Sequence, residues 1–193
     1  TMFTFVVPEA MFDPEDPFRI YDEERQQALI VYFDLGKYDI NPEFRDNRQT
    51  LINLTAVTEM ILGDPHSRVE RVVVAGFASP EGTFRFNDIL SFRRAAAIKH
   101  YLLQTTGLRD EQVWTYNGSV DWRGLRLLVE QSDMPQKERI LRLLESTSDE
   151  AQRLERLKQL DDGAPYRYLF DEVFPLLRNG AFIKVYYSNN PKE

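Results

Sequence analysis

A single arginine lies on the apolar side of a predicted helix, directly after a tight glycine-bounded loop. The hydrophobic run Val72–Ala75 leads into the loop Gly76–Thr83, and the helix follows. At about 100° per residue, Arg94 falls on the same helix face as Leu90 and Ile98. Arginine is almost never buried without a partner for its charge. The chemistry that this pattern predicts is therefore the binding of a carboxylate or another anion.

The anion that meets Arg94 has two possible sources. It is either an internal acid, for which the candidates are Asp34, Asp88 and Asp121, or a group on a ligand. The sequence leaves both alternatives open, and the function of the chain largely depends on which one holds.

The residues around Arg94 also have two interpretations each. Asn87 suits a helix N-cap that accepts a backbone N–H, and it also suits a site residue. Glu81 is either a solvated loop acid or a ligand contact, and Phe77 is either core or pocket wall. Ser79 precedes Pro80, which favours an extended conformation before the turn.

Composition narrows the class of protein. The chain has 193 residues, 42% of them hydrophobic, no cysteine and a net charge of −7. This length suits one domain with a sizeable core. The negative charge disfavours binding to nucleic acid or to an anionic membrane through general electrostatics. Without cysteine, neither disulfides nor thiolate metal sites can form, and no run is long enough to span a membrane.

The motifs of common enzymes are missing from the sequence. The Gly76–Gly82 loop lacks the Gly-Lys-Ser/Thr ending of a phosphate loop, and no Gly-x-Ser-x-Gly elbow occurs. Two scattered histidines, His66 and His100, argue against a zinc site. The acid pair Asp161-Asp162 is better explained by a turn than by a catalytic dyad. We therefore predict that the chain is not an enzyme and holds no metal or cofactor.

Hydrophobic periodicity and cap residues predict the elements that position Arg94. Asn41 before Pro42 predicts a helix start, and Thr147 with Glu150 predicts a capping box for a later helix. The Val-Val-Val run predicts a strand buried on both faces. The strands are expected at 29–33, 69–75, 113–116 and 181–187, and the helices at 41–62, 87–105, 122–131, 136–146, 149–160 and 166–174. The early β-α-β order predicts parallel pairing.

The pattern divides the chain into three parts. Residues 1–27 are expected to form a lead-in strand and linker, which pairs with the main sheet or forms the tail of an upstream domain. Residues 28–120 and 179–190 form the core, and 121–178 form a helical insertion within the same domain. Because the chain begins with Thr1, we expect a piece of a longer precursor, so the missing export signal does not decide its location.

The segment from Asn87 to Ala95 carries a resemblance to a known family. The pattern Asn-x-x-Leu-Ser-x-x-Arg-Ala, after the two loop glycines Gly76 and Gly82, resembles the core of OmpA-like, peptidoglycan-associated domains. The resemblance covers roughly residues 28–120 and 179–187. It implies an α/β fold of the α+β sandwich type: a βαβαββ mixed sheet with helices on one face, here with an extra helical insertion before the last strand.

The resemblance also implies a ligand site, with one departure. In the family, the helix arginine grips a carboxylate of the diaminopimelate in the peptidoglycan stem peptide, and an aspartate after the glycine faces its ammonium group. Here Arg94 is retained, but Phe77, Ala78 and Ser79 replace the usual His-Thr-Asp. The lost charge is worth ~1–2 kcal/mol, and Glu81 could supply it if the loop folds inward. The expected ligand-binding residues are Arg94, Asn87, Ser79, Glu81 and Phe77.

The function that the resemblance implies is a non-catalytic anchor of the Gram-negative cell envelope. Such a module binds peptidoglycan at the periplasmic face of the outer membrane or at the cell surface. The loop resembles a variant branch of outer-membrane-associated proteins. The alternative is a degenerate OmpA-like scaffold without peptidoglycan binding, which assembles a surface or fimbrial structure by engaging a surface-protein partner. We expect neither nucleic acid as a partner nor membrane insertion by this chain.

Overall fold

The computed structural model describes residues 6–15 and 29–189. In these ranges, five strands and six α-helices position the loop and Arg94. The strands are β1 (Val6–Pro8), β2 (Leu29–Tyr32), β3 (Ser67–Ala78), β4 (Val113–Val120) and β5 (Asn179–Asn189). The helices are α2 (Asn47–Leu62), α3 (Phe84–Thr105), α4 (Trp122–Glu130), α5 (Lys137–Ser146), α6 (Glu150–Gln159) and α7 (Ala164–Tyr168). This order confirms the predicted mixed α/β class with helices inserted before the last strand.

The last strand occupies the middle of the sheet. β5 pairs antiparallel with β3, with Val72 opposite Val185, and β4 runs parallel to β3. On its other edge, β5 pairs antiparallel with β2 through residues 179–182 and parallel with β1 through residues 185–187. The sheet is therefore mixed, as expected. Residues 1–5 and 16–28 of the predicted lead-in lie outside the described residues, whereas Val6–Pro8 adds a strand to this sheet.

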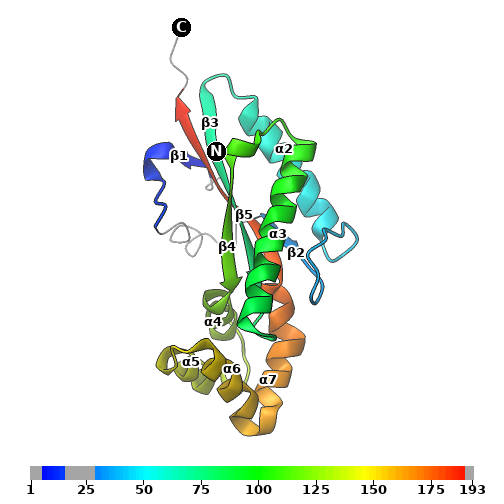
Figure 1. Cartoon of the computed structure of the whole chain (residues 1–193). Helices are drawn as coiled ribbons and strands as arrows, with labels where there is room; N and C mark the ends of the chain where they lie inside the picture. The colour runs from blue at the N-terminus through cyan, green and yellow to red at the C-terminus, as the bar shows by residue number, and fades with distance from the viewer. Residues whose placement is uncertain (1–5, 16–28, 190–193) are drawn as a thin grey trace.

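Alternate residues of β3 face two different cores. Val72 and Val74 pack toward α2 and α3, which lie together on one face of the sheet (Figure 1). Val73 and Phe77 pack into a smaller cluster on the opposite face. Phe12 covers that second face, with ring centroids 5.0 Å from Tyr186 and 5.7 Å from Trp114. The prediction that the Val-Val-Val strand is buried on both sides is confirmed, because Val72, Val73 and Val74 are at most 1% exposed.

The helical insertion has a core of its own. Its helices α4 to α7 gather at one end of the sheet, beyond the first turn of α3 (Figure 1). They enclose apolar side chains that include Leu125, Ile140, Leu157 and Phe174, all fully buried. After α7 the chain continues through a π-helical turn, Leu169–Val173, and a 3-10 turn, Phe174–Leu177, into β5. The four predicted helices are present, with the last shorter than expected.

Three helix starts differ from the predictions, each for a local reason. α2 begins at Asn47, six residues after the expected cap, because Arg45 has a positive φ of 50° and interrupts the helix. Asn41 instead accepts the Glu43 N–H in a turn, and the buried Asn47 amide bonds both the N–H and the carbonyl of Tyr32.

α3 and α6 also use caps other than those predicted. Thr83, not Asn87, caps α3 by accepting the Phe86 N–H, so that Asn87 lies inside the first turns of the helix. Asp149, not Thr147, caps α6 by accepting the Gln152 N–H. Thr147 is instead buried and accepts hydrogen bonds from Arg153 and Arg156.

Gly76 allows α3 to lie directly against β3. A Cβ atom at this position would lie 2.0 Å from the Ser91 carbonyl oxygen and 2.6 Å from the Ala95 nitrogen. Both neighbours are helix backbone and cannot rotate away. The absence of a side chain at Gly76 therefore sets the distance between the helix that carries Arg94 and the strand beneath it.

The first prediction concerns this contact. Gly76→Ala is expected to lower the free energy of unfolding by about 2 kcal/mol or more, because overpacking against backbone forces the helix off the sheet. Gly107→Ala is the matched control: its Cβ would meet only Leu62 Cδ1 at 3.7 Å, so the change should stay within about 0.5 kcal/mol. Urea denaturation of both variants tests this, and equal effects would contradict it.

Candidate functional site

The loop between β3 and α3 folds inward rather than into solvent. It contains Gly82, whose φ of +103° favours glycine, and ends at the cap Thr83. Ser79 is only 4% exposed, and its hydroxyl donates to Glu81 Oε1 at 2.6 Å. Both predicted loop residues therefore point toward the interior, in the direction of the helical insertion.

Arg94 is completely buried and bonded to main-chain oxygens. Its Nε donates to the Lys37 carbonyl at 2.9 Å, Nη1 to the Phe77 carbonyl at 2.8 Å, and Nη2 to the Asp34 carbonyl at 3.3 Å. The guanidinium also lies 5.3 Å from the centre of the Phe33 ring. One side chain thus joins the end of β3, the segment that follows β2 and helix α3.

This arrangement corrects the expected internal partner of Arg94. Among the described residues no carboxylate pairs with it, and Asp34 contributes its carbonyl oxygen instead. Asp88 accepts from Asn117 and Ser119, and Asp121 caps α4 by accepting the Gly124 N–H. Carbonyl oxygens satisfy the hydrogen bonds of a buried guanidinium, but they carry only partial charges.

A second buried arginine, which the sequence analysis missed, meets the loop. Arg178 is the last residue of the insertion and is 7% exposed. Its Nη2 donates to Glu81 Oε1 at 2.8 Å, and its Nε lies 3.1 Å from both that oxygen and the Ser79 hydroxyl. Its carbonyl accepts the Phe33 N–H. The only sequence signal was a cation directly after the apolar run Val173–Leu177.

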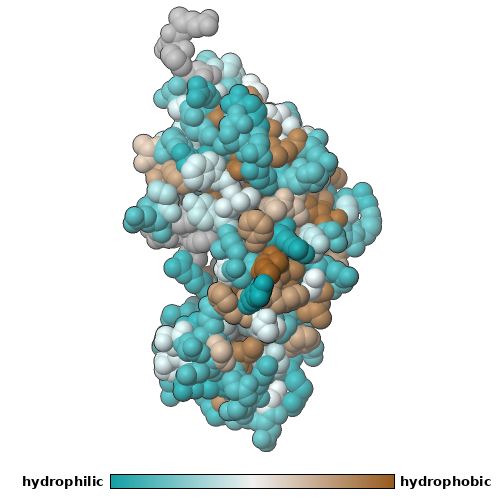
Figure 2. Space-filling view, in the orientation of Figure 1, coloured by the Kyte–Doolittle hydropathy of each residue, from teal (hydrophilic) through white to brown (hydrophobic). Residues whose placement is uncertain are grey.

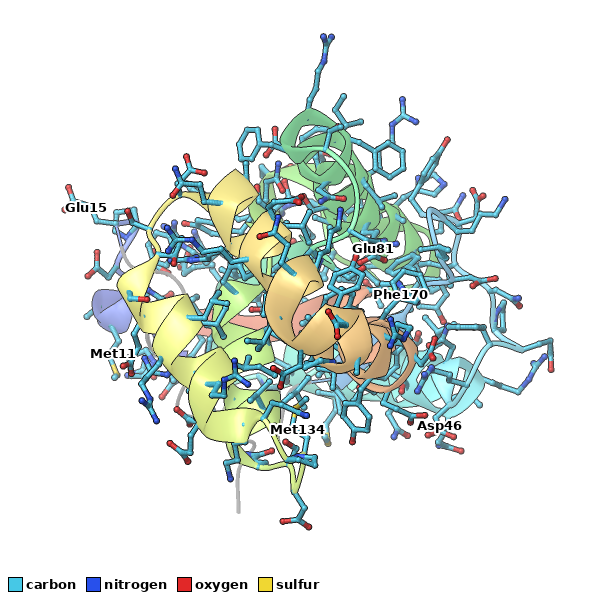
Figure 3. All side chains as sticks on the ribbon, turned by 90° about the horizontal axis from the view of Figure 1, so that it is seen from below. Met11, Glu15, Asp46, Glu81, Met134 and Phe170 are labelled. Atoms are coloured by element: carbon cyan, nitrogen blue, oxygen red, sulfur yellow. The ribbon has the colours of Figure 1, made fainter. Side chains whose placement is uncertain are left out.

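The contact between Glu81 and the insertion involves aromatic side chains. The Arg178 guanidinium lies 5.5 Å from the centre of the Phe170 ring. Figure 3 looks from the insertion toward the sheet and labels Glu81 and Phe170, which lie on either side of the Arg178 contacts. Burial raises the pKa of Tyr166, and the negative charge of Glu81 adds to this effect. The predicted solvated acid is therefore part of a largely buried junction between the two halves of the domain.

The charges in this junction do not cancel. Burial is the main cause that lowers the pKa of Arg94 to about 10; the nearby Arg178 cation contributes to the lowering, and Glu81 opposes it. Arg94 therefore stays protonated at neutral pH. Two arginines and one carboxylate sum to +1. Meanwhile Glu81 Oε2 is buried and has no hydrogen-bond partner. The cluster combines an excess positive charge with an unused carboxylate oxygen.

The two remaining predicted residues lie near this cluster. Asn87 is 3% exposed and stands two turns before Arg94 on the same helix face; its Oδ1 lies beside Gly82, 3.2 Å from where a Cβ would be. Phe77 is core: its carbonyl accepts from Arg94, and its ring fills the space left by Gly118. The structure thus brings the five predicted residues to one end of α3.

The Leu-Ser motif of α3 has a structural use. Ser91 donates to the Asp88 carbonyl and to Asn117 Oδ1. Asn117 Nδ2 in turn donates to the Asp88 carbonyl oxygen at 2.9 Å and to Asp88 Oδ1 at 3.0 Å. This network ties α3 to β4.

Within residues 6–15 and 29–189, no group of three or more His, Asp or Glu could hold a metal, and no helix in these ranges is both long and apolar enough to span a membrane.

The second prediction tests Arg94 as a structural link. Arg94→Leu removes the side-chain donor of the buried Phe77 carbonyl and of the Lys37 carbonyl, whereas the Asp34 carbonyl keeps the Lys37 N–H as a donor. Each unsatisfied group costs about 1–3 kcal/mol. We expect a loss of more than about 3 kcal/mol in the free energy of unfolding. Arg93→Leu is the control, because this exposed neighbour only stacks on Tyr38, a contact worth about 0.5–1 kcal/mol. Similar losses for the two variants in thermal denaturation would refute the link.

The third prediction concerns the junction. Glu81→Ala leaves Arg178 buried and unpaired, which should cost about 3 kcal/mol. Replacing both residues, Glu81→Ala with Arg178→Leu, should cost less than the sum of the two single changes, because neither partner then lacks its counterpart. A double-mutant cycle in urea measures this coupling. Additive effects would show that the ion pair does not hold the insertion to the loop.

Comparisons with known proteins find relatives in sequence and neighbours in structure. No family model matches the chain. Over 94 residues it is 34% identical to a peptidoglycan-associated lipoprotein of Pasteurella multocida (strain Pm70), a match that covers 47% of this chain and 54% of the relative. The chain thus spans about half the length of the curated relative it matches. The crystal structure of the peptidoglycan-associated lipoprotein from Burkholderia pseudomallei covers 82% of this chain and 89% of its own, with 17% identity and a TM-score of 0.43. In sequence, the chain is therefore similar, at modest identity, to a peptidoglycan-associated lipoprotein.

Proposed function

We propose that the chain is a non-catalytic module of the Gram-negative cell envelope that associates with peptidoglycan near the outer membrane. The observation that carries this proposal is the 34% identity over 94 residues to a protein named for its association with peptidoglycan. Ser79 and Asn87 are buried and Glu81 is half-buried at the end of α3 that leads to Arg94, which supports a site there.

The ligand of the proposed site is the stem peptide of peptidoglycan, which carries both carboxylates and an ammonium group. The excess positive charge of Arg94 and Arg178 attracts a ligand carboxylate, and the start of α3 favours an anion there as well. The unpartnered Glu81 Oε2 is suited to accept the ammonium. In this proposal Glu81 replaces the family's missing aspartate, and Ser79 orients it through their 2.6 Å hydrogen bond.

Arg94 acts at this site mainly as a fixed buried charge. Three of its N–H groups are used by carbonyls, and its side chain is fully covered. Direct contact with a ligand would require the Ser79–Thr83 loop to open. After such an opening, the contacts with the ligand fall to Glu81 and Asn87, while Phe77 stays in the core.

A second candidate function follows from the same burial. If the Arg178–Glu81 pair permanently closes the loop, the domain is a scaffold that assembles a surface structure through a protein partner and does not bind peptidoglycan. The observations that favour this candidate are the full burial of Arg94 and the separate apolar core of the insertion.

The fourth prediction separates the two candidates. The wild-type chain should co-sediment with isolated sacculi, and a synthetic stem peptide that contains diaminopimelate should compete. Glu81→Gln keeps the shape but removes the charge that faces the ammonium, so binding should weaken by about tenfold, equivalent to ~1.4 kcal/mol. Glu111→Gln, at an exposed acid paired only with Arg109, is the control and should bind as the wild type does.

Arg94 variants are unsuitable for this test because they are expected to be strongly destabilised. If the folded wild-type chain does not co-sediment, the scaffold replaces the peptidoglycan proposal. If Ser79→Asp then creates binding, the family site has been lost through this one substitution. Binding that Glu81→Gln leaves unchanged would place the ligand elsewhere on the domain.

A further inference from the structure

The solvent side of α3 exposes an unusual number of large apolar side chains. In its first turns, Phe84 is 64% exposed, Phe86 52%, Ile89 43% and Phe92 56%. Figure 2 shows brown, hydrophobic surface over this part of α3, interrupted by strongly hydrophilic groups. Exposed apolar side chains that are contiguous, rather than scattered, mark interaction surfaces.

These side chains form a stripe along the helix. At about 100° per residue, Ile89, Phe92 and Ala96 share the face opposite Arg94, with Phe86 alongside. Ala96 is also exposed. The stripe therefore belongs to the outward face of α3, whereas the site proposed above depends on the inward face. We define the α3 patch as Arg85, Phe86, Ile89, Phe92 and Arg93.

The α3 patch continues into a groove. Arg93, Ala96 and His100 form one wall of a groove of about 540 Å³, and Tyr38 to Ile40 form the other. The Arg93 guanidinium lies 4.9 Å from the centre of the Tyr38 ring, which holds it at the boundary between patch and groove. An elongated apolar surface beside a groove has the shape that receives an amphipathic helix.

The charge of the α3 patch is opposite to that of the whole chain. Arg85 and Arg93 flank the apolar residues, whereas the net charge of the protein is −7. The one acid in this stretch of helix, Asp88, accepts from Asn117 and Ser119 on the β4 side. A basic border around an apolar stripe is complementary to a helix with acidic flanks.

We propose that the α3 patch docks an amphipathic helix with acidic flanks from another protein. A second copy of this chain fits less well, because a two-fold contact would place the basic border of one α3 patch against the basic border of the other. A membrane surface fits less well because only two cations border the patch of a strongly acidic protein. The proposal is independent of peptidoglycan binding, which uses the other face of α3.

The probes for a test are three synthetic helical peptides of about 18 residues, or five turns. All carry the same Leu and Phe stripe, and their flanking positions are all Glu, all Gln or all Lys. With the full chain, fluorescence anisotropy should give at least about tenfold tighter binding for the Glu peptide than for the Lys peptide, a difference that salt reduces. Arg85→Glu with Arg93→Glu should reverse that order.

A matched pair of variants distinguishes specific binding at the α3 patch from nonspecific hydrophobic binding. Phe92→Ser should weaken binding of the Glu peptide by about tenfold, whereas Ile52→Ser, at an equally exposed apolar residue on α2 (56% for both), should leave it unchanged. Equal affinity for all three peptides, equal loss in both variants, or Phe92-dependent binding to phosphatidylglycerol vesicles in place of the Glu peptide would each overturn the proposal.

Discussion

The described structure depends most on the guanidinium of Arg94. Its three hydrogen bonds reach carbonyls of Asp34, Lys37 and Phe77, which belong to segments far apart in the sequence. Asp34 and Lys37 lie in the loop after β2, where the Asp34 carbonyl also accepts the Lys37 N–H, and Phe77 lies near the end of β3. A buried carbonyl without a donor is costly. A long, planar donor with several N–H groups can serve all three at once, which a lysine could not do in the same geometry. Gly76 and the small residues of α3 bring the helix close enough for this to happen.

A second layer of charged residues lies beside Arg94 and leaves the junction with a net charge of +1. Arg178 and Glu81 form an ion pair that lies between the loop after β3 and the end of the insertion. The insertion is therefore more than an appendage: its last residues close the loop that leads into α3. Whether the junction receives a ligand or stays closed, Glu81 is the residue through which the insertion and the core act on each other.

The elements with strong periodicity were predictable from the sequence, and the contacts between them were not. The Val-Val-Val strand, the Arg94 helix and the four helices of the insertion follow from local patterns of apolar residues. The start of α2 was predicted wrongly because Asn41 and Pro42 carry the local signal, whereas the buried Asn47 gains more by bonding Tyr32 across the fold. The burial of Arg94 was evident from its position on the helix, but its carbonyl partners were not, since any residue supplies a carbonyl. Arg178 was missed because it lies between elements, where periodicity carries no information.

The central position of β5 has a consequence for how the chain reaches its fold. β1, β2 and β3 all bond to a strand that is synthesised after them and after the helical insertion. Until that strand arrives, β3 can pair only with β4, and the earlier strands leave their edges open. Pairings so distant in sequence form slowly, and open edges invite association with other chains. During synthesis the insertion, which has its own apolar core, can pack first. β5, which follows it, can then pair with β3 on one edge and with β1 and β2 on the other.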